Sequence, residues 1–205
     1  MAVIDYYFVG ISPYVYLGHR ALVDMAKRHG ATVNYKPVTL KRLWAKSGST
    51  PLADRPPVRR RYRFLELQRH AEARGLPLNL QPKHFPVDAS LAELSVIAIV
   101  EQGGDPVDFM ERVFSGVWVE DADVSDRDTV AGYLTATGFD AEAILEQAGS
   151  DEALALRDRY SREAVEADAI GVPAYVLNGE VFWGQDRIDL LESAIVTGRE
   201  PYGQP

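Results

Sequence analysis

Two short runs of β-branched and aromatic residues flank an Asn178-Gly179 pair near the C-terminus. This pair readily supplies the positive φ angles of a two-residue type I′ turn, so the two runs are predicted to form a β-hairpin. Pro173 cannot donate a hydrogen bond to a sheet, so we expect it to open the first strand of the hairpin. A Val172-Pro173 bond at this entrance favours a cis peptide, although trans is the commoner isomer. A cis bond would leave the backbone N–H and C=O of Val172 open to a peptide-like ligand.

The hairpin is followed by an amphipathic run that predicts a helix. Ile188, Leu191 and Ile195 fall on one side of this run, and Asp186 precedes it. Asp186 has the chemistry of a helix N-cap. In a second interpretation the helix N-terminus holds a ligand carboxylate while Asp186 binds a neighbouring ammonium group. The two interpretations are compatible with each other.

The N-terminal stretch predicts a βαβ unit. Residues Val3–Phe8 are apolar and aromatic, as in a buried strand. Ser12 and Pro13 are typical of the N-cap and first position of a helix, and Gly30 is typical of the residue that ends one. A second strand is predicted over residues 32–38, and a right-handed crossover would place it parallel to the first.

The middle of the chain has helical periodicity throughout. A basic helix is predicted over residues 58–74, and Ser90 to Glu93 reads as a capping box that opens an apolar helix. We therefore predict an α/β fold in which residues 1–40 and 170–205 build one four-stranded mixed sheet. Residues 41–169 would form a large all-helical insertion between the two parts of that sheet.

Composition excludes several classes of function. The 205-residue chain has no cysteine, so it has no disulfide, no thiolate metal site and no thiol of its own for redox exchange. A net charge of −8 argues against a nucleic-acid partner, and no apolar run reaches the roughly 18 residues of a membrane span. No signal peptide is evident, so we expect a cytoplasmic protein. We expect no metal site, because zinc-ligand spacing is absent from the four histidines His19, His29, His70 and His84.

A basic cluster interrupts this acidic chain within the predicted helix at residues 58–74 and just before it. Its default explanation is a solvated helix face. An anion site or a contact between subunits remains open as an alternative. The cluster consists of Arg55, Arg59, Arg60, Arg61 and Arg63.

The order of these elements resembles thioredoxin-like proteins of the DsbA type. Such proteins normally carry Cys-x-x-Cys at the first helix N-terminus, where this chain has Ser12-Pro13-Tyr14-Val15. A serine there resembles the glutathione-dependent branch, in particular 2-hydroxychromene-2-carboxylate isomerases and kappa-class glutathione transferases. The segments that carry the resemblance are Ser12–Leu17, Tyr62–Arg69, Gly171–Pro173 and Phe182–Arg187.

The resemblance implies glutathione as cofactor and gives several residues a role in binding it. Ser12, as the catalytic residue, would hydrogen-bond the glutathione sulfur. Val172, before Pro173, would pair through its backbone with the cysteinyl part of the tripeptide. Gln185 and Asp186 would bind the γ-glutamyl group, with Arg187 as a further contact.

Other positions concern the rest of glutathione and a second subunit. Arg59 matches a basic residue that meets the glycyl carboxylate. Glu66 matches an acidic residue that reaches across a homodimer toward the γ-glutamyl amine. Ser49 replaces an asparagine that contacts the ligand in the family. Val9 stands where relatives often have Asp, and Asp88 stands where asparagine is usual.

The activity implied by the resemblance is an isomerisation through the glutathione thiolate. The thiolate would add reversibly to a conjugated aromatic carboxylate and interconvert 2-hydroxychromene-2-carboxylate and trans-o-hydroxybenzylidenepyruvate. Tyr14 and Trp183, with Phe8, would line the substrate site, unless these aromatics serve only in core packing. The alternatives are a kappa-class-like transferase that releases a thioether and a non-catalytic glutathione-binding module. The sequence leaves the physiological substrate open.

Overall fold

The computed structural model describes residues 1–203, and it contains one four-stranded mixed sheet in the order β2-β1-β3-β4. Strand β1 pairs in parallel with β2, and β3 pairs antiparallel with both β1 and β4. This confirms the predicted mixed sheet. Residues 204 and 205, at the end of the predicted segment 170–205, lie outside the described residues. The strands are β1 Val3–Phe8, β2 Thr32–Pro37, β3 Ala174–Leu177 and β4 Glu180–Trp183.

The predicted hairpin is formed by β3 and β4. Val176 lies opposite Val181 in its ladder. Asn178 and Gly179 connect the strands with φ angles of 52° and 84°, as a type I′ turn requires. The Val172-Pro173 peptide that precedes β3 is cis.

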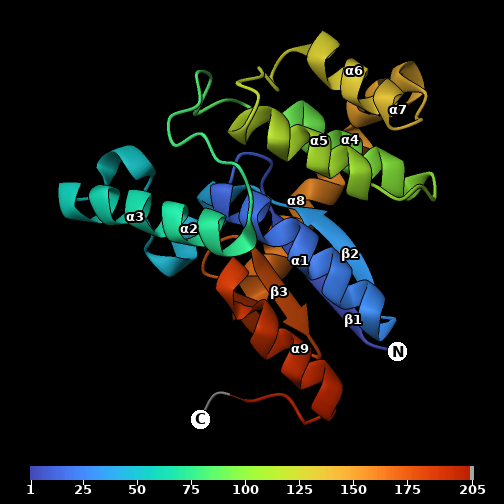
Figure 1. Ribbon diagram of the computed structural model, residues 1–205. Coiled ribbons are helices and arrows are strands. Elements are labelled where there is room, and N and C mark those ends of the chain that lie inside the picture. Colours follow the sequence, from blue (N-terminus) through green and yellow to red (C-terminus); the bar gives the residue numbers. More distant parts are fainter. Residues whose placement is uncertain (204–205) are drawn as a thin grey trace.

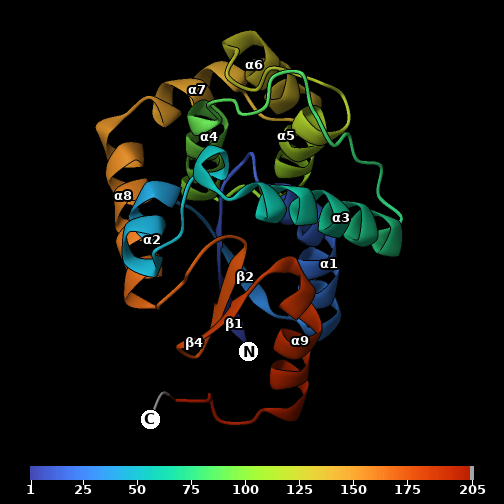
Figure 2. The same cartoon turned by 90° about the vertical axis from the view of Figure 1, so that its left-hand side faces the viewer.

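Helices α2 to α8 all lie between β2 and β3 in the chain. In both views α4 to α7 gather at one end of the sheet, whereas α1 and α9 run along it (Figures 1 and 2). None of the helices within residues 1–203 is long and apolar enough to cross a membrane. The α-helices are α1 Pro13–His29, α2 Leu40–Ser47, α3 Pro57–Arg74, α4 Ser90–Glu101, α5 Val107–Trp118, α6 Arg127–Ala136, α7 Ala141–Ala148, α8 Asp151–Glu166 and α9 Ile188–Thr197; Leu52–Asp54 and Gln185–Arg187 are 3₁₀ turns.

One face of the sheet packs an aromatic core against α1. Tyr6 of β1 stacks on Tyr175 of β3 at 5.4 Å between ring centroids, and His19 of α1 stacks on Tyr6 at 6.0 Å. Phe114 of α5 meets both Phe8 and His19 edge-on. Burial lowers the pKa of His19 to about 3, so this histidine is a neutral core residue. Because α5 belongs to the helical stretch, the core of the sheet continues into the helices.

The opposite face of the sheet carries an ion cluster beneath α8. Lys36 of β2 lies 2.9 Å from Asp5 of β1 and 2.8 Å from Glu163 of α8. Burial by itself lowers the pKa of Lys36, but the hydrogen bonds to these two carboxylates raise it to about 12. The ammonium group also lies over the rings of Tyr7 and Tyr160. These contacts fasten α8 to the sheet.

The start of one helix differs from its prediction. Ser90 does not cap α4 but is its first residue, and its N–H donates to Asp88 Oδ1 at 2.9 Å. Glu93 therefore takes no part in a capping box. It lies in the central part of α4, where every residue from Ala92 to Ile99 is buried.

Candidate functional site

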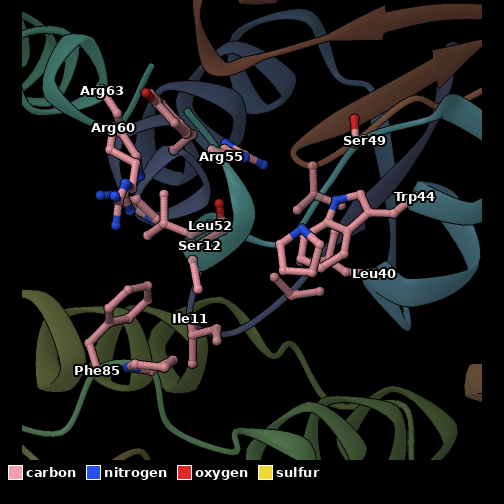
Figure 3. A pocket seen from close by; sticks show the side chains of 18 of the residues that line it. Ile11, Ser12, Leu40, Trp44, Ser49, Leu52, Arg55, Arg60, Arg63 and Phe85 are labelled. Atoms are coloured by element: carbon pink, nitrogen blue, oxygen red, sulfur yellow. The ribbon is translucent and has the colours of Figure 1, made fainter. Parts of the chain in front are cut away.

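A pocket of about 840 Å³ opens between the N-terminus of α1, α2, α3 and the segment before β3. This volume is within the usual range for small-molecule sites. Figure 3 shows Ser12 near its centre, with Arg60 and Arg63 on one side and Leu40 and Trp44 on the other. The lining is largely apolar and consists of residues 9, 11–14, 40, 44, 49, 51–53, 55, 57, 60, 61, 63, 64, 85, 86, 170–172 and 183.

Ser12 combines two functions at the start of α1. The Val9–Ser12 turn is closed by the Ser12 N–H, which donates to the Val9 oxygen at 3.2 Å. The Ser12 Oγ accepts from the Val15 N–H at 3.3 Å, so the predicted N-cap is confirmed. Its hydroxyl proton is still available to a ligand, because the cap uses Oγ only as an acceptor. A free donor beside the positive end of a helix favours an anion in this part of the pocket.

Val172 lines the same pocket as Ser12. Its backbone N–H and C=O make no hydrogen bond with any residue of the described chain, 1–203. By contrast, the carbonyl of the following Pro173 accepts from the Gly184 N–H at 2.9 Å. The structure therefore places a serine hydroxyl and the unpaired backbone groups of Val172 in the same pocket. From the sequence, the hydroxyl is expected to meet a thiol, and the Val172 backbone is expected to meet the peptide that carries this thiol.

Three more of the predicted residues line this pocket, namely Tyr14, Ser49 and Trp183. Trp183 is 49% exposed at the end of β4. Its indole ring packs against Gly171, and a Cβ atom added to that glycine would lie 2.8 Å from Trp183 Nε1. Burial raises the pKa of Tyr14, although the nearby Arg63 opposes this. The Tyr14 phenol is therefore a neutral hydrogen-bonding group on the pocket wall. Phe8 does not line the pocket and belongs to the aromatic core.

The basic cluster is divided by the helical period of α3. Arg60 and Arg61 line the pocket together with Arg55 and Arg63, whereas Arg59 does not, although Arg59, Arg60 and Arg61 are all exposed. None of these four lining guanidinium groups has a carboxylate partner among residues 1–203. Arg63 lies 5.8 Å from the centre of the Phe85 ring, and its burial lowers its pKa. The pocket thus offers unpaired positive charge in an otherwise apolar lining.

Several lining residues did not emerge from the sequence analysis. Leu40 and Trp44 form one apolar wall, and their i, i+4 spacing on α2 was the signal that could have identified it. Phe85 forms the opposite wall and precedes Pro86 through a second cis peptide. No local pattern places the segment around Phe85 beside α3, because that contact depends on the tertiary fold.

Gln185 does not face the pocket. It is 1% exposed and packs against α1 at Gly18, where a Cβ atom would lie 2.7 Å from Gln185 Cβ. Arg74 of α3 donates through Nε to Gln185 Oε1 at 2.8 Å and through Nη2 to the Gln185 backbone oxygen at 2.7 Å. In this arrangement, the Gln185 side chain joins α3 to the turn before α9.

Asp186 is not the N-cap of α9, which is a correction to one of its two interpretations. The chain first makes the 3₁₀ turn Gln185–Arg187, so Asp186 lies inside that turn and its carboxylate pairs with Arg187. Gly184 precedes the 3₁₀ turn with φ 109°. A side chain would not fit there, because its Cβ atom would lie 2.5 Å from Asp186 Oδ1. The backbone N–H groups of Gln185 and Asp186 find no partner in the described chain. Neither residue lines the main pocket, so binding of a ligand carboxylate by these groups stays a prediction.

Arg187 and Glu66 also lie outside the main pocket. Arg187 lines a second cavity of about 480 Å³, and Trp183 borders both cavities. Glu66 pairs with Arg69 at 2.6 Å on α3 and lies 3.5 Å from His70. Neither residue therefore meets the Ser12 region within one chain. The predicted role of Glu66 across a dimer stays a prediction.

A buried carboxylate lies directly behind the Ser12 turn. Glu93 Oε1 accepts from the Gly10 N–H at 2.8 Å, and Glu93 Oε2 lies 3.4 Å from Arg157 Nη1 of α8. Burial raises the pKa of Glu93 to about 7, while the Gly10 N–H and Arg157 oppose the rise. Its proximity to the turn could not be inferred from the local sequence.

The β2-β1-β3-β4 sheet, the helices inserted before β3 and the cis proline at its start define a thioredoxin fold of the DsbA type. Serine replaces cysteine at the first helix N-terminus, so the chain has no disulfide chemistry of its own at that position. The chain belongs to the family described as DSBA-like thioredoxin domain, which it matches over residues 3–196. This confirms the fold inferred from the sequence.

Two curated relatives resemble the chain along most of its length. The 2-hydroxychromene-2-carboxylate isomerase of Sphingobium xenophagum is 27% identical over 195 residues, covering 94% of this chain and 97% of the relative. The protein of the same name from Pseudomonas putida is 29% identical over 196 residues, covering 94% of each. A solved structure of 2-hydroxychromene-2-carboxylate isomerase superposes with a TM-score of 0.81 and 27% identity, covering 95% of both chains. The resemblance to these isomerases is thus confirmed.

Proposed function

We propose that this protein is a glutathione-dependent isomerase of 2-hydroxychromene-2-carboxylate or a related conjugated aromatic acid. The observation that carries the proposal is that the Ser12 hydroxyl and the unpaired backbone of Val172 line the same pocket. A chain without cysteine needs a thiol from elsewhere for this chemistry, and glutathione is a peptide that can pair with Val172. The named activity of the relatives supports the same assignment.

The chemistry requires the thiol to ionise near neutral pH. A free thiol has a pKa near 8.5 and is only a few per cent thiolate at pH 7. Lowering this pKa by about two units takes roughly 2.7 kcal/mol of preferential thiolate stabilisation. A hydrogen bond from Ser12 and the positive N-terminus of α1 supply stabilisation of this kind.

The thiolate then acts as a temporary nucleophile. The cyclic hemiketal first opens: its ring C–O bond breaks, and the proton of the 2-hydroxyl group is transferred to the phenol oxygen, which gives the cis keto acid. The thiolate forms a C–S bond to the conjugated carbon of this keto acid, and the displaced electron pair moves onto the keto oxygen as an enolate. The former double bond is now single and rotates. Return of the electron pair breaks the C–S bond and releases the thiolate unchanged, so no net redox change or group transfer occurs.

The pocket lining fits a flat aromatic acid beside a tripeptide. Trp44, Phe85 and Tyr14 offer aromatic and apolar walls, and the unpaired guanidinium groups of Arg60 and Arg63 offer sites for carboxylates. The free N–H groups of Gln185 and Asp186 suit the γ-glutamyl carboxylate. In this proposal Ser49 is a further glutathione contact, and Glu66 reaches the amine from the second subunit of a homodimer.

The proposal is tested by following both substrate and product. Purified protein is incubated with glutathione and a chromene carboxylate, or with glutathione and chlorodinitrobenzene. An isomerase converts the first substrate and returns all of the free thiol. Consumption of thiol with a thioether as product would instead assign a transferase. Calorimetry that shows no glutathione binding would leave neither activity in place.

Arg63→Met is expected to raise the KM for the aromatic acid about tenfold with a smaller effect on kcat. A hydrogen bond to a charged group contributes about 1.5–3 kcal/mol, and methionine keeps the contact with Phe85 while removing the charge. Arg59→Met is the matched control, because Arg59 lies on the same helix outside the pocket. Steady-state kinetics with both substrates varied measures the effect. If Arg59→Met weakens glutathione binding and Arg63→Met has no effect, the carboxylate site lies at Arg59, as the sequence predicted, and not at Arg63.

A further inference from the structure

The turn that carries Ser12 is held by a side chain from the helical insertion. In the Val9–Ser12 turn, the Ser12 N–H donates to Val9, which leaves the Gly10 N–H without a partner inside the turn. Glu93 of α4 supplies that partner through Oε1 at 2.8 Å. This contact joins residues 83 positions apart, so it connects the first loop of the sheet to a helix that follows much later.

The surroundings of Glu93 leave its side chain almost wholly buried. Glu93 is 8% exposed, and a Cβ atom at Gly10 would lie 3.0 Å from Ala89 Cβ, so α4 lies directly against the turn. Two charged groups face the carboxylate, namely Arg157 of α8 and Asp88 before α4. A buried carboxylate is costly compared with an apolar side chain of similar size. Its contact with the Gly10 N–H is a specific one that an apolar side chain cannot replace.

We propose that Glu93 is a positioning residue, which acts through the Gly10 N–H to hold the Ser12 hydroxyl in the orientation that stabilises the glutathione thiolate. This inference rests on the proposed function. Glu93 does not line the pocket and touches neither glutathione nor the substrate. It acts by fixing the turn immediately before α1, so the helical insertion controls the acidity of the bound thiol.

Two conservative variants separate the hydrogen bond from the charge. Glu93→Asp keeps the charge beside Arg157 but shortens the side chain, so that it cannot reach Gly10. Glu93→Gln keeps an oxygen acceptor within reach of Gly10 and removes the charge. Ser95→Ala is the control, because Ser95 is buried on the same helix and donates only to Leu91 of α4.

The Asp variant is expected to raise the pKa of bound glutathione by about one unit and to lower kcat/KM at neutral pH about tenfold. The Gln and Ser95 variants are expected to stay within about threefold of the parent protein. The thiolate is measured by its ultraviolet absorbance as a function of pH. An unchanged thiol pKa in the Asp variant, or an equal loss in the Asp and Gln variants, overturns the proposal.

A measurement without glutathione tests the link from Glu93 to the turn separately from the proposed function. Hydrogen exchange of the Gly10 amide, followed by NMR, is expected to be faster in Glu93→Asp than in the parent protein and in Ser95→Ala. Equal protection in all three overturns the positioning of the turn. If the parent protein binds no glutathione while Gly10 responds as expected, the proposed function fails and the link from Glu93 to the turn stands.

Discussion

Ser12→Ala is expected to lower kcat/KM for the glutathione-dependent isomerisation about 100-fold. The variant loses the Ser12 hydroxyl at the N-terminus of α1, and with it most of the roughly 2.7 kcal/mol needed to ionise the thiol. The pKa of bound glutathione should rise toward 8.5, so activity should recover partly at alkaline pH. Kinetics across a range of pH and thiolate absorbance measure the two effects independently.

A control is needed because Ser12 also caps α1. Loss of an N-cap costs about 1 kcal/mol of stability, which by itself would not change the activity of the folded protein. Ser150 provides the comparison, since its Oγ caps α8 by accepting from the Ala153 N–H at 3.2 Å and it lies outside the pocket. Ser150→Ala should show the same loss of stability with unchanged kcat/KM. Equal activity of the two variants would remove the catalytic role of Ser12.

The parts of the fold that could be predicted are those in which local chemistry decides the outcome. The Asn178-Gly179 turn, the Ser12 cap and the end of α1 at Gly30 each depend on neighbouring residues in the sequence, and each is confirmed. The N-cap interpretation of Asp186 is wrong because the chain inserts a 3₁₀ turn before α9. That turn depends on Gly184 and on the packing of Gln185 against α1, which residue order alone does not reveal.

The candidate site was predictable in outline through the resemblance and not in detail. Ser12, Val172 and Ser49 line one pocket although 160 positions separate the first two, and the family pattern placed all three in one site. The arginines were harder to assign. Arg59 and Arg60 are both exposed, but only Arg60 lines the pocket, and a comparison of motifs does not distinguish neighbouring positions in a run of arginines. Contacts between distant elements, such as Arg74 with Gln185, carry no local signal at all.

Trp118→Ala is expected to destabilise the protein by about 3–5 kcal/mol, the largest loss of stability we expect from a single side chain. Trp118 is 0% exposed at the end of α5 and packs against Phe85 with 5.0 Å between ring centroids. A void there removes the support of Phe85, the pocket wall on which Arg63 lies. Denaturant unfolding should therefore show a lower midpoint, and glutathione should restore part of the stability if it binds this pocket.

Trp118→Phe separates the packing of this residue from its polar atom. The indole Nε1 of Trp118 is buried without a hydrogen-bond partner among the described residues, so replacement by phenylalanine breaks no hydrogen bond. It also leaves a smaller void than replacement by alanine. We expect it to cost about 1 kcal/mol. Trp183→Ala gives the opposite contrast, because Trp183 is half exposed at the pocket mouth and should affect substrate binding with little loss of stability. If Trp118→Ala were as mild as Trp118→Phe, the ring would not be supporting the pocket wall, and Phe85 would owe its position to the backbone around it.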